Sequence, residues 1–142
     1  LPRAPTQQPT PASIPGAGTT PTGDLVKALQ SPAPPVLIDV LPRRFGHETL
    51  PDAVWLRSAG NYFEHKDAEA TALLGDILAK ITPSKQTMIV FFCESTQCWL
   101  SYNASLRAAS LGYTNVQWYR GGIAAWRAPK LPTLVAVLEA QF

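Results

Sequence analysis

The residues best suited to do chemistry are Cys93 and Cys98, the only two cysteines in the 142-residue sequence. Cys93 ends the apolar run of residues 87–93 (TMIVFFC), and the polar residues 94–97 separate it from Cys98. A thiolate is a strong nucleophile, and two thiols can also cycle through a disulfide. The pair therefore indicates nucleophilic catalysis, redox chemistry or a structural cross-link.

A strand followed by a helix is expected to position Cys93. Residues 87–93 are apolar without alternation, which predicts a strand buried on both faces. The apolar residues after Cys98 predict a helix that ends at Gly112: Leu100, Ala104, Leu106, Ala108 and Leu111. Ligand sites lie at the carboxyl ends of parallel strands, where the next helix points backbone N–H groups at the loop. Cys93 is then either a stabilised thiolate or a buried cysteine that only packs.

Strands and helices alternate along the rest of the chain. Thr22 is predicted to cap a short helix, residues 67–81 have the period of an amphipathic helix, and residues 121–126 indicate a sharp turn and a short helix. Residues 36–40, 53–56 and 115–119 are predicted strands, whereas residues 133–142 fit a helix or an extended segment equally. This order predicts an α/β domain with a mostly parallel sheet covered by helices on both faces.

Composition limits the organisation and the partners. Six of the 14 prolines lie in residues 1–23, which predicts a disordered tail followed by one domain over residues 24–142. Charged residues make up only 15% of the chain and the net charge is +2, which argues against nucleic-acid binding. No apolar run reaches the roughly 18 residues of a membrane span.

The start of the chain bears on its compartment. It begins at Leu1, and its only methionine is Met88. A removed signal peptide is one explanation, because the proline- and threonine-rich start resembles a linker that follows a secretory cleavage site. We therefore expect a periplasmic or otherwise exported protein.

Residues 24–133 resemble the rhodanese (sulfurtransferase) domain in the order VLIDV, LPDAVWL, a strand ending in Cys93, and LGYTNVQWYRGGIAAW. The resemblance implies that Cys93 takes sulfur from a thiosulfate-like donor as a persulfide and passes it to a thiol or to cyanide. More narrowly, IDVLPR, AVWL and CWLSYNA resemble small exported rhodanese-like proteins with a cysteine pair followed by tryptophan, associated with pyrroloquinoline-quinone-dependent alcohol catabolism. That likeness implies a quinoprotein dehydrogenase or cytochrome c as partner.

The resemblance also nominates binding residues. The loop residues expected to surround the donor are Glu94, Ser95, Thr96, Gln97 and Trp99, with Asp39 and Arg120 nearby. The arginine usual near the far end of a rhodanese loop is missing, and the phosphate-binding arginine of the phosphatases of this fold is replaced by Trp99, which argues against a phosphatase. No cofactor is expected, and no metal, because His47 and His65 lack ligand spacing with the cysteines and are expected on the surface or in loops.

The role of Cys98 stays open at this point. If the loop curls back so that the two Cα atoms come within about 4.4–6.8 Å, Cys98 could resolve a persulfide or mixed disulfide on Cys93. The domain would then be a thiol oxidoreductase or a redox-gated sulfur carrier. A purely structural disulfide and a non-catalytic interaction module are the alternatives.

Overall fold

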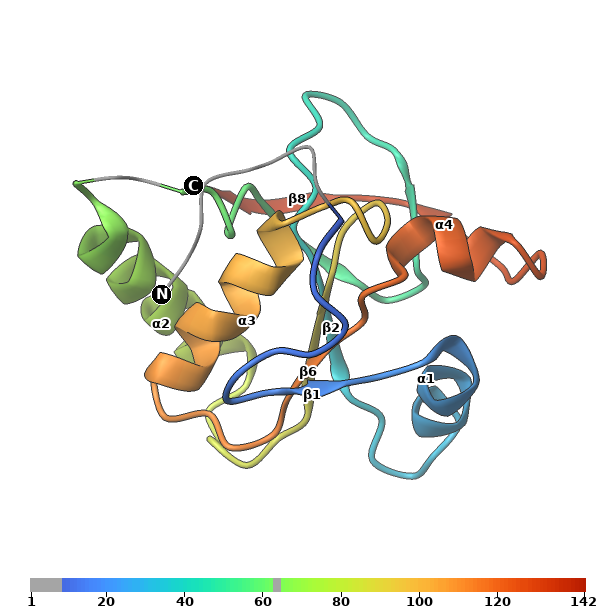
Figure 1. Ribbon diagram of the computed structural model, residues 1–142, viewed down its shortest axis with the longest axis horizontal. Coiled ribbons are helices and arrows are strands. Elements are labelled where there is room, and N and C mark those ends of the chain that lie inside the picture. Colours follow the sequence, from blue (N-terminus) through green and yellow to red (C-terminus); the bar gives the residue numbers. More distant parts are fainter. Residues whose placement is uncertain (1–8, 63–64) are drawn as a thin grey trace.

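The computed structural model describes residues 9–62 and 65–142, which form an α/β fold around a six-stranded parallel sheet (Figure 1). The strand order is β1-β6-β5-β2-β4-β8. The strands are β1 (Gly18–Thr19), β2 (Val36–Asp39), β4 (Val54–Arg57), β5 (Ile89–Phe92), β6 (Val116–Trp118) and β8 (Leu138–Gln141). The predicted fold class is confirmed.

The central strands explain the unalternating apolar runs. Every residue of β5 is buried, and β5 lies between β2 and β6, with Ile38 opposite Phe91 and Asp39 opposite Phe92. A strand covered on both faces needs apolar side chains at every position. The carboxyl ends of β2 and β5 therefore lie side by side, and Cys93 follows directly from one of them.

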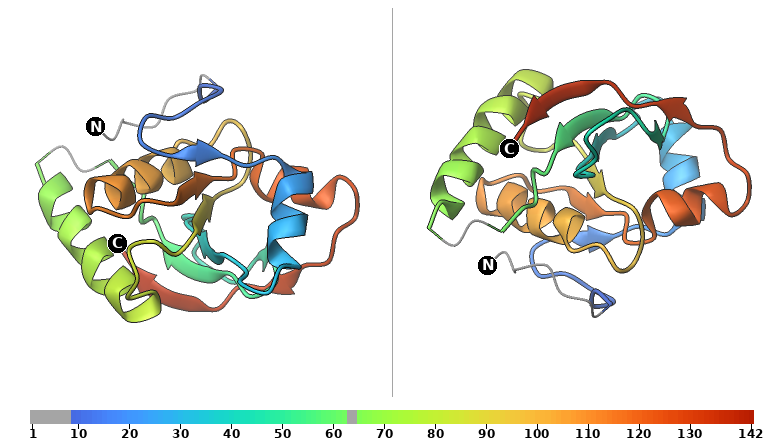
Figure 2. Two further views of the ribbon diagram at one scale, coloured as in Figure 1. Left: turned by 90° about the horizontal axis from the view of Figure 1, so that it is seen from below. Right: turned by 90° about the horizontal axis from the view of Figure 1, so that it is seen from above.

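Helices cover both faces of the sheet (Figure 2). On one face lie α2 (Asp67–Ile81) and α3 (Leu100–Ser110), and on the other lie α1 (Thr22–Leu29) and α4 (Gly122–Arg127). Thr22 begins α1 but its side chain does not cap the helix; its hydroxyl instead pairs with the Tyr119 hydroxyl at 2.7 Å. Among the described residues, none of the helices has both the length and the apolarity to cross a membrane.

The last residues are extended. β7 (Leu134–Val135) pairs antiparallel with β3 (Glu48–Thr49), and β8 adds to the edge of the main sheet beside β4. The sequence left a helix and an extended segment open here, and the structure has the extended form.

The predicted disordered tail is wrong for its described part. Residues 9–20, which we call the N-terminal strap, lie along the domain: Ile14 is buried against Tyr102 and Trp118, and β1 pairs with β6. In Figure 1 this blue segment runs beside the loop that follows β5. The folded unit thus begins before the expected boundary at residue 24, and residues 1–8 lie outside the described residues.

Candidate active site

Cys93 and Cys98 form a disulfide at the carboxyl end of β5, with their Cα atoms 6.3 Å apart. This spacing lies within the range that a disulfide needs. The loop curls back because the Cys98 N–H donates to the Ser95 carbonyl at 3.0 Å and the Gln97 N–H donates to the Ser95 hydroxyl at 3.3 Å. These two N–H groups are therefore bonded within the loop, to Ser95.

The start of α4 holds the backbone of Cys93 in place. The Ile123 N–H donates to the Cys93 carbonyl, and the Ala124 N–H donates to the Glu94 carbonyl, both at 2.9 Å. Gly122 has a φ of +63°, and a Cβ there would overlap the Cys93 carbonyl. Glycine is therefore required both for the turn and for the close approach. The predicted turn does bring this segment to the cysteine loop.

The Cys93 sulfur is enclosed by α3 and β6. Cys93 is only 1% exposed, and the Ser101 hydroxyl oxygen lies 3.1 Å from its Sγ. The Trp118 indole N–H donates to the same hydroxyl oxygen at 2.9 Å. Ser101 was not singled out from the sequence, because a serine in the first turn of a helix is ordinary.

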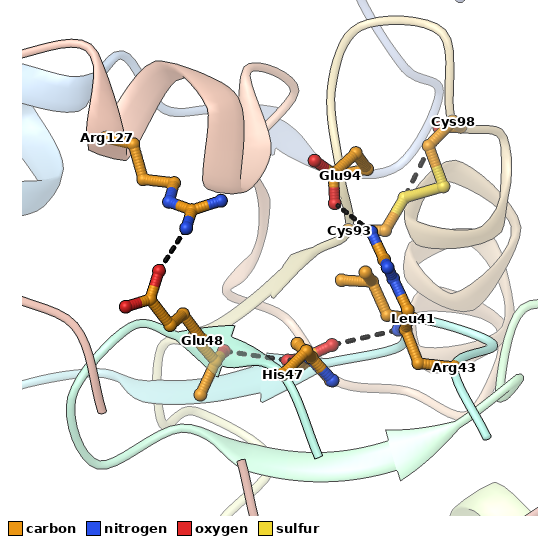
Figure 3. A network of polar contacts seen from close by, with 10 residues as sticks. Leu41, Arg43, His47, Glu48, Cys93, Glu94, Cys98 and Arg127 are labelled. Atoms are coloured by element: carbon orange, nitrogen blue, oxygen red, sulfur yellow. Dashed lines mark hydrogen bonds and ion pairs between the residues drawn. A yellow bond between two sulfur atoms is a disulfide. The ribbon is translucent and has the colours of Figure 1, made fainter. Parts of the chain in front are cut away.

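Glu94 is turned away from the sulfur and toward Arg43, as Figure 3 shows. The two charged groups lie 3.5 Å apart, with side chains 46% and 57% exposed, so the pair contributes little stability. On the other side of the loop, the Thr96 carbonyl is bound by Thr10 of the strap. Trp99 packs edge-to-face on Tyr102, with ring centroids 5.1 Å apart.

Asp39, which was expected near the sulfur donor, is bonded to other residues of the protein. Asp39 is fully buried and accepts hydrogen bonds from the Leu41 N–H, the Thr49 hydroxyl and the His47 Nε2 at 2.6–2.9 Å. It therefore organises the loop after β2, and His47, expected on the surface, has a side chain only 8% exposed.

Arg120 points to the N-terminal strap. Its guanidinium donates to the Thr10 carbonyl at 2.7 Å and to the Thr10 hydroxyl at 3.1 Å. These contacts give it a role in holding the strap, which the sequence could not indicate because the two residues are 110 positions apart.

Arg107 is a buried support residue that the sequence interpretation missed. Its guanidinium donates to the Ala59 carbonyl at 2.7 Å, the Asn61 carbonyl at 2.6 Å and the Asp67 carboxylate at 2.7 Å. It thereby ties α3 to the segment after β4 and to the start of α2. An arginine near a helix end gives no local sign that it is buried.

One cavity lies away from the disulfide, and the described residues form no metal cluster. The cavity has a volume of about 340 Å³ and lies beside Val26, Trp126 and Pro132, and no residue of the cysteine loop lines it. Within residues 9–62 and 65–142, no three His, Cys, Asp or Glu side chains gather as metal ligands would.

The chain is thus an α/β domain with a parallel sheet that carries a cysteine at the carboxyl end of a central strand, followed by a loop and a helix. Residues 22–129 match the Rhodanese-like domain family, and the chain belongs to that family. No curated protein gives a match.

Solved structures with similar folds include sulfurtransferases. Wild-type EanB superposes with a TM-score of 0.65 at 20% identity, over 84% of this chain and 32% of that protein. The thiosulfate sulfurtransferase from Pseudomonas aeruginosa superposes with a TM-score of 0.61 at 17% identity, over 89% of this chain and 21% of that protein. Variants of EanB have been solved with hercynine and with ergothioneine covalently linked to a persulfide cysteine. The chain thus spans less than a third of either protein's length, and the likeness shows the fold.

Proposed function

We propose that the reduced domain carries sulfur as a persulfide on Cys93 and that Cys98 resolves this persulfide. The observation that carries the proposal is the disulfide itself, which joins the cysteine at the end of β5 to a second cysteine on the adjoining loop. The rhodanese family and its sulfurtransferase neighbours support sulfur transfer in general. The second cysteine adds an intramolecular route by which the persulfide on Cys93 can be removed.

The first half-reaction is a displacement at sulfur. The Cys93 thiolate attacks the outer sulfur of a thiosulfate-like donor, the sulfur–sulfur bond of the donor breaks, and sulfite leaves with the electron pair. Cys93 then holds the sulfur as a persulfide. An acceptor thiolate or cyanide attacks the outer sulfur, and Cys93 leaves as a thiolate.

Cys98 provides a second reaction that removes the persulfide from Cys93. Its thiolate can attack the Cys93 Sγ, hydrosulfide leaves with the electron pair, and the observed disulfide forms. An external dithiol then reduces the disulfide to two thiols. The disulfide closes a loop with a sequence separation of only 5, so it stabilises the fold by about 2 kcal/mol in the chain-entropy view. We therefore expect the reduced domain to stay folded.

The loop offers a donor anion little positive charge. Arg43 is paired with Glu94, and Arg120 is bonded to Thr10. Of the nominated loop residues, Ser95 and Gln97 bond within the loop, Thr96 bonds the strap, and Trp99 packs on Tyr102. We therefore propose that an uncharged sulfur donor reacts faster than thiosulfate.

A thiol–disulfide exchange module is the second candidate, and the same disulfide favours it. In that case the pair passes electrons and carries no sulfur. The two candidates differ in one measurable species, the persulfide on Cys93.

The test uses the reduced full chain with thiosulfate and, separately, with inorganic polysulfide. Sulfur transfer predicts an intact-mass gain of one sulfur atom and thiocyanate on cyanide treatment. Cys93→Ser should gain no sulfur, whereas Cys98→Ser should hold more persulfide than wild type because the resolving thiol is gone. A Cys98→Ser protein that stays unmodified with both donors overturns sulfur transfer, and reversible disulfide exchange in the wild-type protein then supports the redox module.

Export and a quinoprotein dehydrogenase or cytochrome c partner remain proposals. The disulfide supports an oxidising compartment, and the partner rests on the cysteine-pair motif resemblance. Acid-quenched and alkylated periplasmic extracts should contain the protein with its cysteines oxidised. Recovery of the protein only in the cytoplasmic fraction, with free thiols, would contradict export.

A further inference from the structure

We propose that Ser101 is a positioning residue whose hydroxyl proton is directed at Cys93 by Trp118 and stabilises the Cys93 thiolate when the disulfide opens. The inference deepens the proposed function, but it concerns the thiolate itself and does not require that sulfur be transferred. It rests on three buried groups: the Cys93 Sγ, the Ser101 hydroxyl and the Trp118 indole.

Counting hydrogens assigns the direction of each contact. A serine hydroxyl has one hydrogen and two lone pairs, and an indole N–H only donates. Trp118 therefore occupies a lone pair of Ser101 at 2.9 Å. Because the disulfide sulfur of Cys93 carries no hydrogen, Ser101 is the donor across the 3.1 Å contact to that sulfur.

Burial strengthens this chain of hydrogen bonds. Ser101 is 1% exposed and Trp118 is fully buried, so water does not compete at either group. Ile14 of the strap and Tyr102 pack against Trp118, and the rings of Tyr102 and Trp118 meet edge-to-face at 5.4 Å. In such surroundings, successive hydrogen bonds polarise and reinforce one another.

Other groups of this region oppose a negative charge on the sulfur or are bonded to other partners. The Cys98 carbonyl oxygen lies 3.6 Å from the Cys93 Sγ and would repel a thiolate. The charge of Glu94 faces Arg43, and Arg120 is held by Thr10. The Ser101 hydroxyl thus supplies a donor where a neighbouring carbonyl opposes the charge.

The two cysteines are unequally exposed, which indicates the sulfur that an external thiolate attacks and the cysteine that leaves. Cys98 is half-buried, whereas Cys93 is almost fully buried. An external thiolate therefore attacks the Cys98 Sγ, a mixed disulfide forms there, and Cys93 leaves with the electron pair. A leaving thiolate that accepts a hydrogen bond leaves more readily, because a more acidic thiol is the better leaving group.

The test titrates Cys93 by ultraviolet thiolate absorbance in a Cys98→Ser background, where it is the only cysteine. Ser101→Ala should raise the pH of half-ionisation by about one unit, the effect expected of a hydrogen bond to a charged group. Ser105→Ala is the matched control, because Ser105 is also a buried α3 serine but donates to the Ser101 carbonyl at 2.8 Å. This control should titrate like the parent, and Ser101→Thr, which keeps the hydroxyl, should restore the parent value.

Disulfide reduction gives an independent readout with both cysteines present. At a pH above both half-ionisation points, Ser101→Ala should shift the equilibrium with dithiothreitol about tenfold toward the disulfide, or about 30 mV. Trp118→Phe, which keeps an aromatic ring but removes the N–H, should raise the half-ionisation pH by less than Ser101→Ala does. Trp118→Phe also tests the proposal if Ser101→Ala fails to fold.

An unchanged half-ionisation pH in Ser101→Ala or in Trp118→Phe overturns the role of Ser101. A shift in Ser105→Ala equal to that in Ser101→Ala overturns it too. Failure of the proposed function looks different, because no persulfide would then form while Ser101→Ala still shifted the titration. The two hypotheses are therefore separable.

Discussion

Thr10 and Thr96 are joined by two hydrogen bonds although they lie 86 positions apart: the Thr10 N–H and hydroxyl both donate to the Thr96 carbonyl, at 2.9 and 2.6 Å. Arg120 donates to Thr10 from the other side. The N-terminal strap is thereby bound to the loop that connects Cys93 and Cys98. The strap thus restricts the movements of the loop that opening the disulfide requires.

Thr10→Val should therefore speed reduction of the disulfide. The variant removes the hydroxyl contacts to Thr96 and Arg120, which costs about 1 kcal/mol of stability and loosens the loop. The rate with dithiothreitol is the measurement. Thr20→Val is the matched control, because it removes a strap hydroxyl bonded to Gln117 at 2.9 Å, away from the loop. Equal rates in the two variants would contradict the role of the strap.

Asp39→Ala should destabilise the fold without changing the chemistry. It leaves the Leu41 N–H, Thr49 hydroxyl and His47 ring without their buried acceptor, and we expect a loss of about 3 kcal/mol or more in urea unfolding. The rate of persulfide formation per folded molecule should equal that of wild type. A tenfold slower rate of persulfide formation in the folded variant would instead indicate that Asp39 contributes to binding the sulfur donor.

The elements with a strong local pattern were predictable from sequence. The apolar run before Cys93 and the period of residues 67–81 reflect burial on two faces and on one face respectively, and both appear in the structure as β5 and α2. Local patterns fail where the partner is distant. Ile14 is buried because Trp118 lies across from it, and nothing in the proline- and threonine-rich segment around it indicates that contact.

The candidate site shows the same division. The placement of Cys93 at a strand end followed from the sequence pattern, but the pairing with Cys98 depends on how the loop curls, which hydrogen bonds to Ser95 decide. The role of Ser101 on α3 was not predictable, because it depends on the hydrogen bond from the indole of Trp118 on β6. Residue type and spacing therefore identified the reactive atoms but not the groups that govern them.

Arg107→Met should be among the most damaging substitutions on α3. It leaves the buried Ala59 carbonyl without its donor and also removes the contacts to Asn61 and Asp67, so we expect a loss of about 3 kcal/mol or more in denaturant unfolding. Arg107→Lys should not restore stability, because an ammonium cannot reproduce the planar set of donors. Arg127→Met, at an exposed arginine paired with an exposed glutamate, should change stability by less than about 0.5 kcal/mol.

Gly122→Ala should impair closure of the disulfide. The added Cβ meets the Cys93 carbonyl and forces the backbone out of the left-handed conformation, so the end of β5 must shift. We expect slower oxidation of the two thiols and a lower unfolding midpoint. Gly23→Ala is the control, since a Cβ there has no neighbour within 4 Å and the residue lies in α1. Similar oxidation kinetics in the two variants would rule out this role of Gly122.

The two edges of the main sheet are formed by β1 and β8, which come from the first and last parts of the described chain. Edge strands, which are paired on one side only, open by local unfolding at lower free energy than central strands do. In native-state hydrogen exchange, the amides of Thr10 and Thr20 should therefore become deuterated by sub-global opening, while those of β5 exchange only on global unfolding. Brief detachment of the strap would then uncover Trp118 while the sheet that carries Cys93 remains intact.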